Sequence, residues 1–152
     1  MKPFTYYLRV RYGECDAQKV VFNSRYADYV DVAVNEFVRA LGISDDLIDG
    51  PLDFQLVKQT TEWKAPARFD QVLALGVTTE RLGHTSFTLR TEFRIAGASE
   101  EVIASVETIY VLVDARTLRK TPLTDRLRAA LLEGGKGKET DHAEYLKLRI
   151  TN

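Results

Sequence analysis

The clearest pattern of apolar and polar positions along the chain lies in residues 25–41. Apolar residues recur there at the i, i+3, i+4, i+7 spacing of one helix face, with polar residues on the other face. Gly42 follows as a stop signal. Asn23 and Ser24 come just before, and both are residue types whose side chains can cap a helix N-terminus. The pattern predicts one long amphipathic helix with a single buried face.

The pattern changes to that of strands on either side of this helix. Residues 5–11 are rich in aromatic and β-branched side chains, as strands are. Residues 86–95 alternate strictly between apolar and polar side chains, the period of a half-buried strand. Residues 102–113 become apolar on both parities, which favours a central strand covered on both faces. The predicted strands are therefore 5–11, 54–63, 72–79, 86–95 and 102–113.

The C-terminal part predicts a second helix and then a break. Residues 123–132 have helical spacing, and the run Gly134-Gly135-Lys136-Gly137-Lys138 interrupts it. We expect one domain over residues 1–133 and a polar tail over residues 134–152. One long helix laid across a curved antiparallel sheet of about five strands, with a C-terminal helix, is an α+β fold.

Composition excludes several classes of protein. The formal net charge is −1, so no overall positive field exists to bind nucleic acid or an anionic membrane. No apolar run approaches the roughly 20 residues that span a bilayer, and the first residues lack a signal-peptide core, so we expect a cytoplasmic protein. The single Cys15 and two distant histidines predict no disulfide, no metal site and no bound cofactor.

Three segments of the chain carry recognisable motifs. The first is Tyr12-Gly13-Glu14-Cys15-Asp16 with the following Val20-Val21-Phe22-Asn23-Ser24-Arg25-Tyr26. The second is Trp63-Lys64-Ala65-Pro66-Ala67-Arg68-Phe69-Asp70, and the third is Arg81-Leu82-Gly83-His84-Thr85-Ser86-Phe87. In this order of elements, they resemble acyl-CoA thioesterases of the hotdog superfamily, in the branch that is similar to 4-hydroxybenzoyl-CoA thioesterase. The match spans residues 5–123, and it implies the hotdog fold and thioester hydrolysis.

The resemblance implies that Asp16 is the catalytic carboxylate. A carboxylate there could attack the thioester carbonyl or act as the base that activates water, and both routes stay open. The amides at the start of the helix would stabilise the oxyanion, with the donor near Asn23, our second expected catalytic residue. By residue type alone, Asp16 is more commonly a turn cap and Asn23 a helix cap.

Further residues of these segments are expected to bind the substrate. We place Ser24, Tyr26 and Lys19 beside the acyl or thioester group, although an aromatic residue at helical spacing often belongs to the core. Many members of the branch have glycine at the position of Lys19, and histidine or tyrosine at that of Asn23. Lys19 could narrow the pocket or bring a cation to the thioester.

A basic cluster is expected for the phosphates of coenzyme A. The resemblance points to the segments that contain Lys64, Arg68, Arg81 and His84, and the alternative is an ordinary solvated face. Glu36 is expected in a surface or interface salt bridge, and Asp70 in a turn. Cys15 is not expected to be a nucleophile, because the neighbouring Asp16 disfavours a thiolate.

The resulting hypothesis is an acyl-CoA thioesterase that assembles as a homodimer or homotetramer, because a lone hotdog sheet leaves one face and one edge uncovered. The alternatives are a thioesterase for acyl carrier protein and a module that binds acyl-CoA without cleaving it. A hotdog dehydratase is disfavoured because neither His84 nor His142 lies near the predicted helix.

Overall fold

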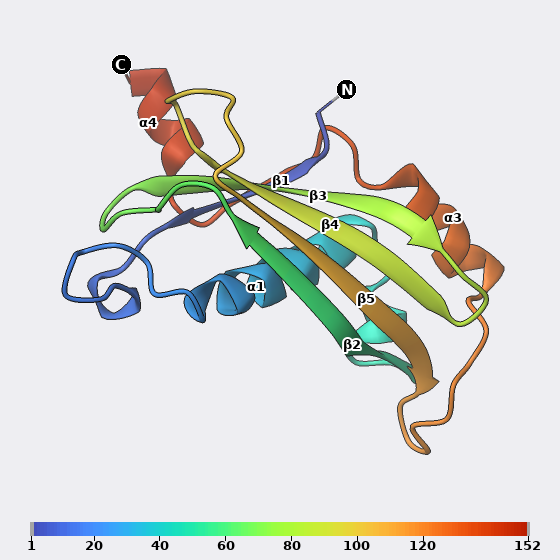
Figure 1. The fold of residues 1–152 in the computed structure, drawn as a ribbon. Coiled ribbons are helices and arrows are strands. Elements are labelled where there is room, and N and C mark those ends of the chain that lie inside the picture. The colour runs from blue at the N-terminus through green and yellow to red at the C-terminus, as the bar shows by residue number, and fades with distance from the viewer. Residues whose placement is uncertain (1, 152) are drawn as a thin grey trace.

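A six-stranded sheet with one long helix across it forms the body of the molecule (Figure 1). The computed structural model describes the backbone of residues 2–151 and the side chains of residues 2–148. The strands are β1 (Phe4–Arg9), β2 (Leu52–Trp63), β3 (Val72–Leu82), β4 (Ser86–Ile95), β5 (Ala104–Asp114) and β6 (Glu139–Asp141). The helices are α1 (Arg25–Ala40), α2 (Ser44–Leu47), α3 (Asp125–Glu133) and α4 (Tyr145–Thr151), with a 3₁₀ turn η1 at Tyr12–Glu14.

The sheet order is β2-β5-β4-β3-β1-β6, and all neighbours are antiparallel except β1 and β6. The predicted α+β arrangement is thereby confirmed. β5 lies between β2 and β4, as its two-sided apolar pattern predicted. Among the described residues, no helix is long and apolar enough to cross a bilayer.

The core lies between α1 and the inward face of the sheet. The apolar stripe of α1 is buried as the sequence predicted, and the ring of Phe37 lies 5.7 Å from that of Phe4 on β1. β4 turns Phe87, Leu89 and Phe93 towards the same core. Burying each such side chain stabilises the fold by about 1.5–3 kcal/mol. This packing fixes where the first turn of α1 lies relative to the strands.

The face of the sheet that points away from α1 is largely polar. Arg90 of β4 lies there between Glu80 of β3, at 3.0 Å, and Glu107 of β5, at 3.5 Å. These partly exposed ion pairs link three neighbouring strands in register. The strict alternation along residues 86–95 therefore separates a core face from a solvent face, as predicted.

β2 is one edge of the sheet, and it is not purely polar. It is hydrogen-bonded to β5 on one side, and within the described chain no strand covers its other side. A bulge interrupts the pairing between Leu56 and Lys58. Three large apolar side chains on this strand are exposed: Leu56, Val57 and Trp63. An open edge with apolar side chains is a surface that proteins usually cover.

The segment after α3 folds back onto the sheet. Thr124 caps α3, accepting from the Leu127 amide at 3.2 Å, and Gly134 ends it with a left-handed φ of 74°. β6 then pairs in parallel with β1, and Tyr145 of α4 packs on Tyr7, with 5.2 Å between ring centroids. β6 was not predicted, because three residues are too few to show a strand period.

Candidate active site

Asp16 lies in a tight turn between two short paired segments. Cys15 and Val21 form an antiparallel bridge, and the Asp16 amide donates to the Val20 carbonyl at 2.9 Å. The Asp16 carboxylate accepts from the Gln18 amide through Oδ1, at 2.8 Å. Among the described residues, nothing donates to Oδ2, and the side chain is exposed. Asp16 therefore caps its turn with one oxygen and keeps the other available for chemistry.

Lys19 closes this turn in a backbone conformation that suits glycine. Its φ is +62°, and its amide donates to the Asp16 carbonyl at 3.0 Å. A side chain in the left-handed region is crowded by its own backbone, whereas glycine is not. The glycine that many members of the resembled branch carry here would relieve that crowding. The Lys19 side chain is exposed and forms no ion pair with any described residue.

The first residues of α1 differ from the capping pattern that Asn23 and Ser24 predicted. Ser24 has helical backbone angles, φ −70° and ψ −19°, and its side chain accepts no capping hydrogen bond. The Arg25 amide bonds to the Phe22 carbonyl at 2.9 Å. Within the described chain, the amides of Asn23 and Ser24 donate no hydrogen bond. Both residues are exposed, so these amides remain available to an anion at the positive end of the helix dipole.

Glu14, which the sequence did not single out, holds the Asp16 turn and α1 together. Its Oε1 accepts from the Arg11 amide and from the Tyr29 hydroxyl, each at 2.8 Å. Its Oε2 accepts from the Arg11 guanidinium at 2.8 and 3.1 Å. Its backbone carbonyl accepts from the Phe22 amide at 3.0 Å. The one signal for it in the sequence is its place three residues after Arg11, the spacing of a capping box.

The ionisation of this cluster follows from its hydrogen bonds. Desolvation works to raise the pKa of Glu14, but the hydrogen bonds from Arg11 and Tyr29 outweigh it and lower that pKa. Desolvation and the neighbouring Glu14 carboxylate raise the pKa of Tyr29 far above its usual range. Glu14 is therefore an anion and Tyr29 a neutral donor at physiological pH.

Tyr26 lies in the core, which corrects its expected place as a substrate contact. It is 2% exposed, and its ring packs against Phe93 at 5.3 Å and against Trp63 at 6.1 Å. Its hydroxyl accepts from the Ala67 amide at 3.4 Å. Helical spacing put Tyr26 on the apolar stripe, and that stripe is buried. The neighbouring Trp63, 48% exposed, is the aromatic ring that remains accessible here.

The four expected cationic residues fall into two separate groups within one chain. Lys64 and Arg68 lie in the loop between β2 and β3, which is bonded to the Asp16 turn through the bridge of Arg68 with Val20. Arg81 and His84 lie at the opposite end of β3. That strand has 11 residues, at about 3.3 Å each. A single cluster of all four is therefore wrong for one chain, because an extended strand separates the two pairs.

The other titratable groups have structural roles. Glu36 forms a surface ion pair with Arg39 at 2.7 Å, and Asp70 lies in a turn with φ +70° and contacts Arg9 at 3.4 Å, both as predicted. Burial raises the pKa of the Cys15 thiol, and the charges of Glu14 and Asp16 add to that rise. A Cys15 thiolate is therefore disfavoured, as expected.

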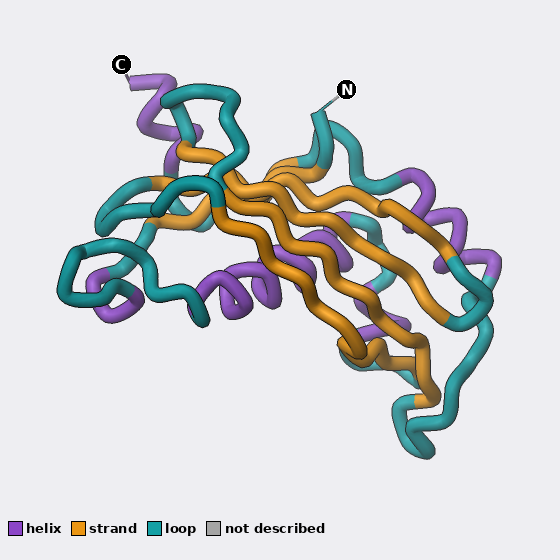
Figure 2. Tube along the Cα trace, viewed as in Figure 1, coloured by secondary structure: helices purple, strands orange, loops and turns teal. Residues whose placement is uncertain are grey.

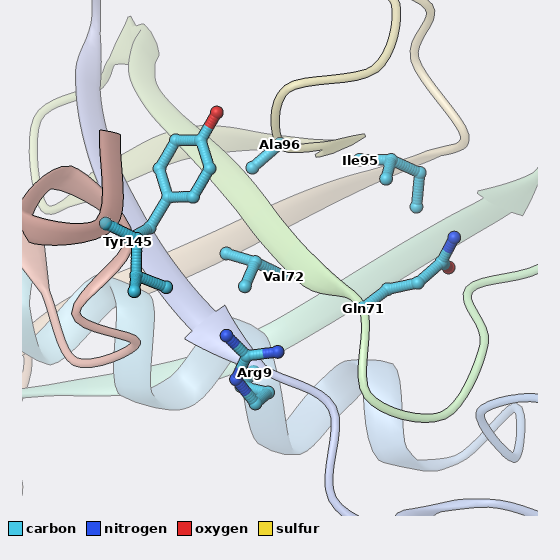
Figure 3. A pocket seen from close by; sticks show the side chains of 7 residues that line it. Arg9, Gln71, Val72, Ile95, Ala96 and Tyr145 are labelled. Atoms are coloured by element: carbon cyan, nitrogen blue, oxygen red, sulfur yellow. The ribbon is translucent and has the colours of Figure 1, made fainter. Parts of the chain in front are cut away.

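A hollow of about 520 Å³ lies on the polar side of the sheet, and Asp16 is not among its lining residues (Figure 3). Arg9, Val72 and Tyr145 are among the side chains that surround it. Its described lining residues include no carboxylate and no histidine, so it offers no base for hydrolysis. The tube in Figure 2 shows α4 on this side of the sheet and α1 on the other.

Comparison with known proteins assigns the family. Residues 10–131 match the model of the thioesterase-like superfamily. The chain belongs to this superfamily. Acyl-CoA thioester hydrolase YbgC of Escherichia coli is 28% identical over 121 residues, which are 79% of this chain and 89% of that one. The predicted enzyme class, a thioester hydrolase, is confirmed by this membership.

Solved structures agree with the assignment. A gentisyl-coenzyme A thioesterase has a TM-score of 0.74 and 30% identity, covering 84% of this chain and 98% of that one. A 1,4-dihydroxy-2-naphthoyl-CoA thioesterase from Synechocystis has a TM-score of 0.74 and 22% identity, covering 84% and 94%. The second likeness concerns the fold alone. Together they confirm the predicted hotdog fold of this superfamily member.

The backbone of Lys19 leads to a first prediction. Lys19→Gly should raise the free energy of unfolding by about 1 kcal/mol, because glycine removes the crowding at φ +62°. Urea denaturation measures this change. Lys19→Ala is the matched control: it also removes the charge but keeps the Cβ, so no comparable gain is expected. A Lys19→Gly protein no more stable than Lys19→Ala would contradict the interpretation.

Proposed function

We propose that this superfamily member hydrolyses acyl-CoA thioesters, with Asp16 as the catalytic carboxylate. The observation that carries the proposal is the free Oδ2 of Asp16 on a turn tied to a helix start with unused amides. Glu14 connects the two, since it precedes the Asp16 turn and its carbonyl binds the Phe22 amide. The named activities of the two relatives, acyl-CoA thioester hydrolase and gentisyl-coenzyme A thioesterase, support this choice of substrate class.

The proposed chemistry uses both parts of the site. The Asp16 carboxylate either attacks the thioester carbonyl carbon, expelling the thiolate and forming an anhydride that water cleaves, or removes a proton from the attacking water. In both routes the carbonyl oxygen gains negative charge. The amides of Asn23 and Ser24 would donate to that oxygen, where one donor can be worth about 10²- to 10³-fold in kcat. The exposed Trp63 ring lies next to this helix start and offers an apolar surface to the acyl group.

The decisive test of the proposal is Asp16→Asn. The amide can still accept from Gln18, so the turn should fold, but it is neither a base nor a nucleophile. We expect acyl-CoA hydrolysis to fall by about 10²-fold or more, measured as free thiol release on a panel of short, long and aryl acyl-CoAs. Asp70→Asn, an exposed carboxylate in another turn, should keep full activity.

Full activity of Asp16→Asn on a substrate that the wild type hydrolyses would refute the role of Asp16. The panel also addresses the alternatives. Binding without turnover by the wild type would favour the non-catalytic module. Faster release from acyl carrier protein than from coenzyme A, with one acyl chain, would favour the carrier-protein thioesterase.

Lys64 and Arg68 are the cations that we propose for the coenzyme A phosphates. Both are exposed, and neither pairs with an acidic side chain of the described chain. Replacing either by alanine should raise KM by about two- to fivefold, the worth of an exposed ion pair, and weaken the increase of KM with salt. Arg81→Ala is the control and should leave KM unchanged. An equal effect of all three variants would contradict this assignment.

We also propose that two chains associate along β2, as a homodimer or within a homotetramer. The open edge of β2 and its exposed Leu56 and Val57 support this choice of surface. Val57→Lys should shift the protein towards monomer in light scattering at micromolar concentration, because a charge would have to be buried at the edge. Leu132→Lys changes an exposed leucine of α3 and should leave the mass unchanged. A wild-type monomer would refute the proposal.

A further inference from the structure

Glu14 is a buried charge two residues before Asp16, and its side chain is hydrogen-bonded to Arg11 and to Tyr29 of α1. It is 9% exposed, and its carboxylate accepts four hydrogen bonds, three from Arg11 and one from Tyr29. A buried carboxylate is costly unless such bonds compensate the loss of water. Arg11 is largely exposed and could reach solvent instead, so Glu14 is the member of this cluster that depends on the others.

The bonds of Glu14 add to the Cys15–Val21 bridge in joining the segment before Asp16 to α1. Arg11 directly precedes η1, Phe22 precedes the first turn of α1, and Tyr29 lies in the second turn of α1. Asp16 follows Glu14 by two residues, and Asn23 follows Phe22 directly. The side chain of Glu14 thus links the Asp16 segment to α1, whose direction is set by core packing, and its carbonyl is bonded to Phe22, just before the free amides. Removing the carboxylate of Glu14 would remove the bond that its side chain makes to α1.

We propose that Glu14 is a positioning residue, which holds the Asp16 carboxylate and the Asn23 and Ser24 amides in register across the thioester. The inference rests on the proposed function, since it assigns Glu14 a part in the same reaction. Glu14 does not touch the reacting atoms; it acts through the turn and the helix that it joins. A misplacement of a reacting group by about 1 Å can lower the rate by about 10²-fold. Loss of the hydrogen bonds of Glu14 should therefore affect kcat more than substrate binding.

Tyr29→Phe is the mildest test, because it removes one hydroxyl and keeps the packing of the ring. We expect kcat to fall by about 10- to 100-fold with KM changed less than twofold. Glu14→Gln should lower kcat by a similar or larger factor. The double variant should lower kcat by less than the product of the two single factors, because both substitutions disrupt the same hydrogen bond. Each is measured with an acyl-CoA that the wild type hydrolyses, well below the Tm of the variant.

Tyr6→Phe is the matched control. Tyr6 is also buried, at 4% exposed, and its hydroxyl makes a bond of the same length, 2.8 Å, to His142. That bond joins β1 to the segment after β6 and involves no residue of the Asp16 turn or of α1. Tyr6→Phe should lower the Tm about as much as Tyr29→Phe and leave kcat unchanged. If Tyr29→Phe and Glu14→Gln also lower the Tm alone, Glu14 is only structural and the proposal is overturned.

A second readout separates this proposal from the proposed function. The ¹⁵N–¹H signals of Asp16, Asn23 and Ser24 should move in Tyr29→Phe and stay in place in Tyr6→Phe. Unchanged signals in Tyr29→Phe would refute the positioning role, whatever the substrate. Shifted signals in a protein that hydrolyses no acyl-CoA would support the positioning role and refute the activity instead.

Discussion

The apolar stripe of α1 has to be buried, and the inward face of the sheet is the surface that buries it. Tyr26, Val30 and Phe37 on the helix meet Phe4, Phe87 and Phe93 or their neighbours on the strands. Because this contact extends along the whole helix, it fixes both its direction and its first turn. The positive end of α1 is therefore held beside the Asp16 turn by packing that has no catalytic role itself. The site depends on the core for its geometry.

Close to Asp16, three departures from the usual local rules lie together. Lys19 occupies a left-handed backbone, Glu14 is a buried anion, and the first amides of α1 have no cap from Ser24. Each departure has an energetic cost of its own, and α3, which is capped at both ends, shows that this sequence can cap a helix. Such costs tend to gather where function needs a strained or unsatisfied group. Their closeness within residues 14–24 supports the place that we propose for the reaction.

The two sides of the sheet serve different purposes. The inward side carries the core, while the outward side carries ion pairs such as that of Arg90 with Glu80, and α4 covers part of it. The open edge of β2 and the exposed Trp63 lie on the same strand, whose last residue is Trp63. A partner chain on this edge would approach the ring that we propose for the acyl group. The contact between the two chains and the surface for the acyl group would then adjoin each other at the edge of β2.

Periodicity alone determined the long helix, the alternating β4 and the central β5, because burial of one face leaves a regular pattern in the sequence. The resemblance to the thioesterase branch, and not the periodicity, brought Asp16 into view in the turn that precedes the helix. Only the tertiary structure decided which residues lie beside Asp16 and the start of α1. Glu14 gave no periodic signal: its spacing from Arg11 marks only a short turn, and Tyr29 is brought to it by folding. The structure places Tyr26 in the core and not at the site. It also places Arg81 far from Arg68, because the extended strand β3 separates these two residues. β6 adds to the sheet through pairing with β1, since backbone hydrogen bonds across a chain leave no trace in three residues.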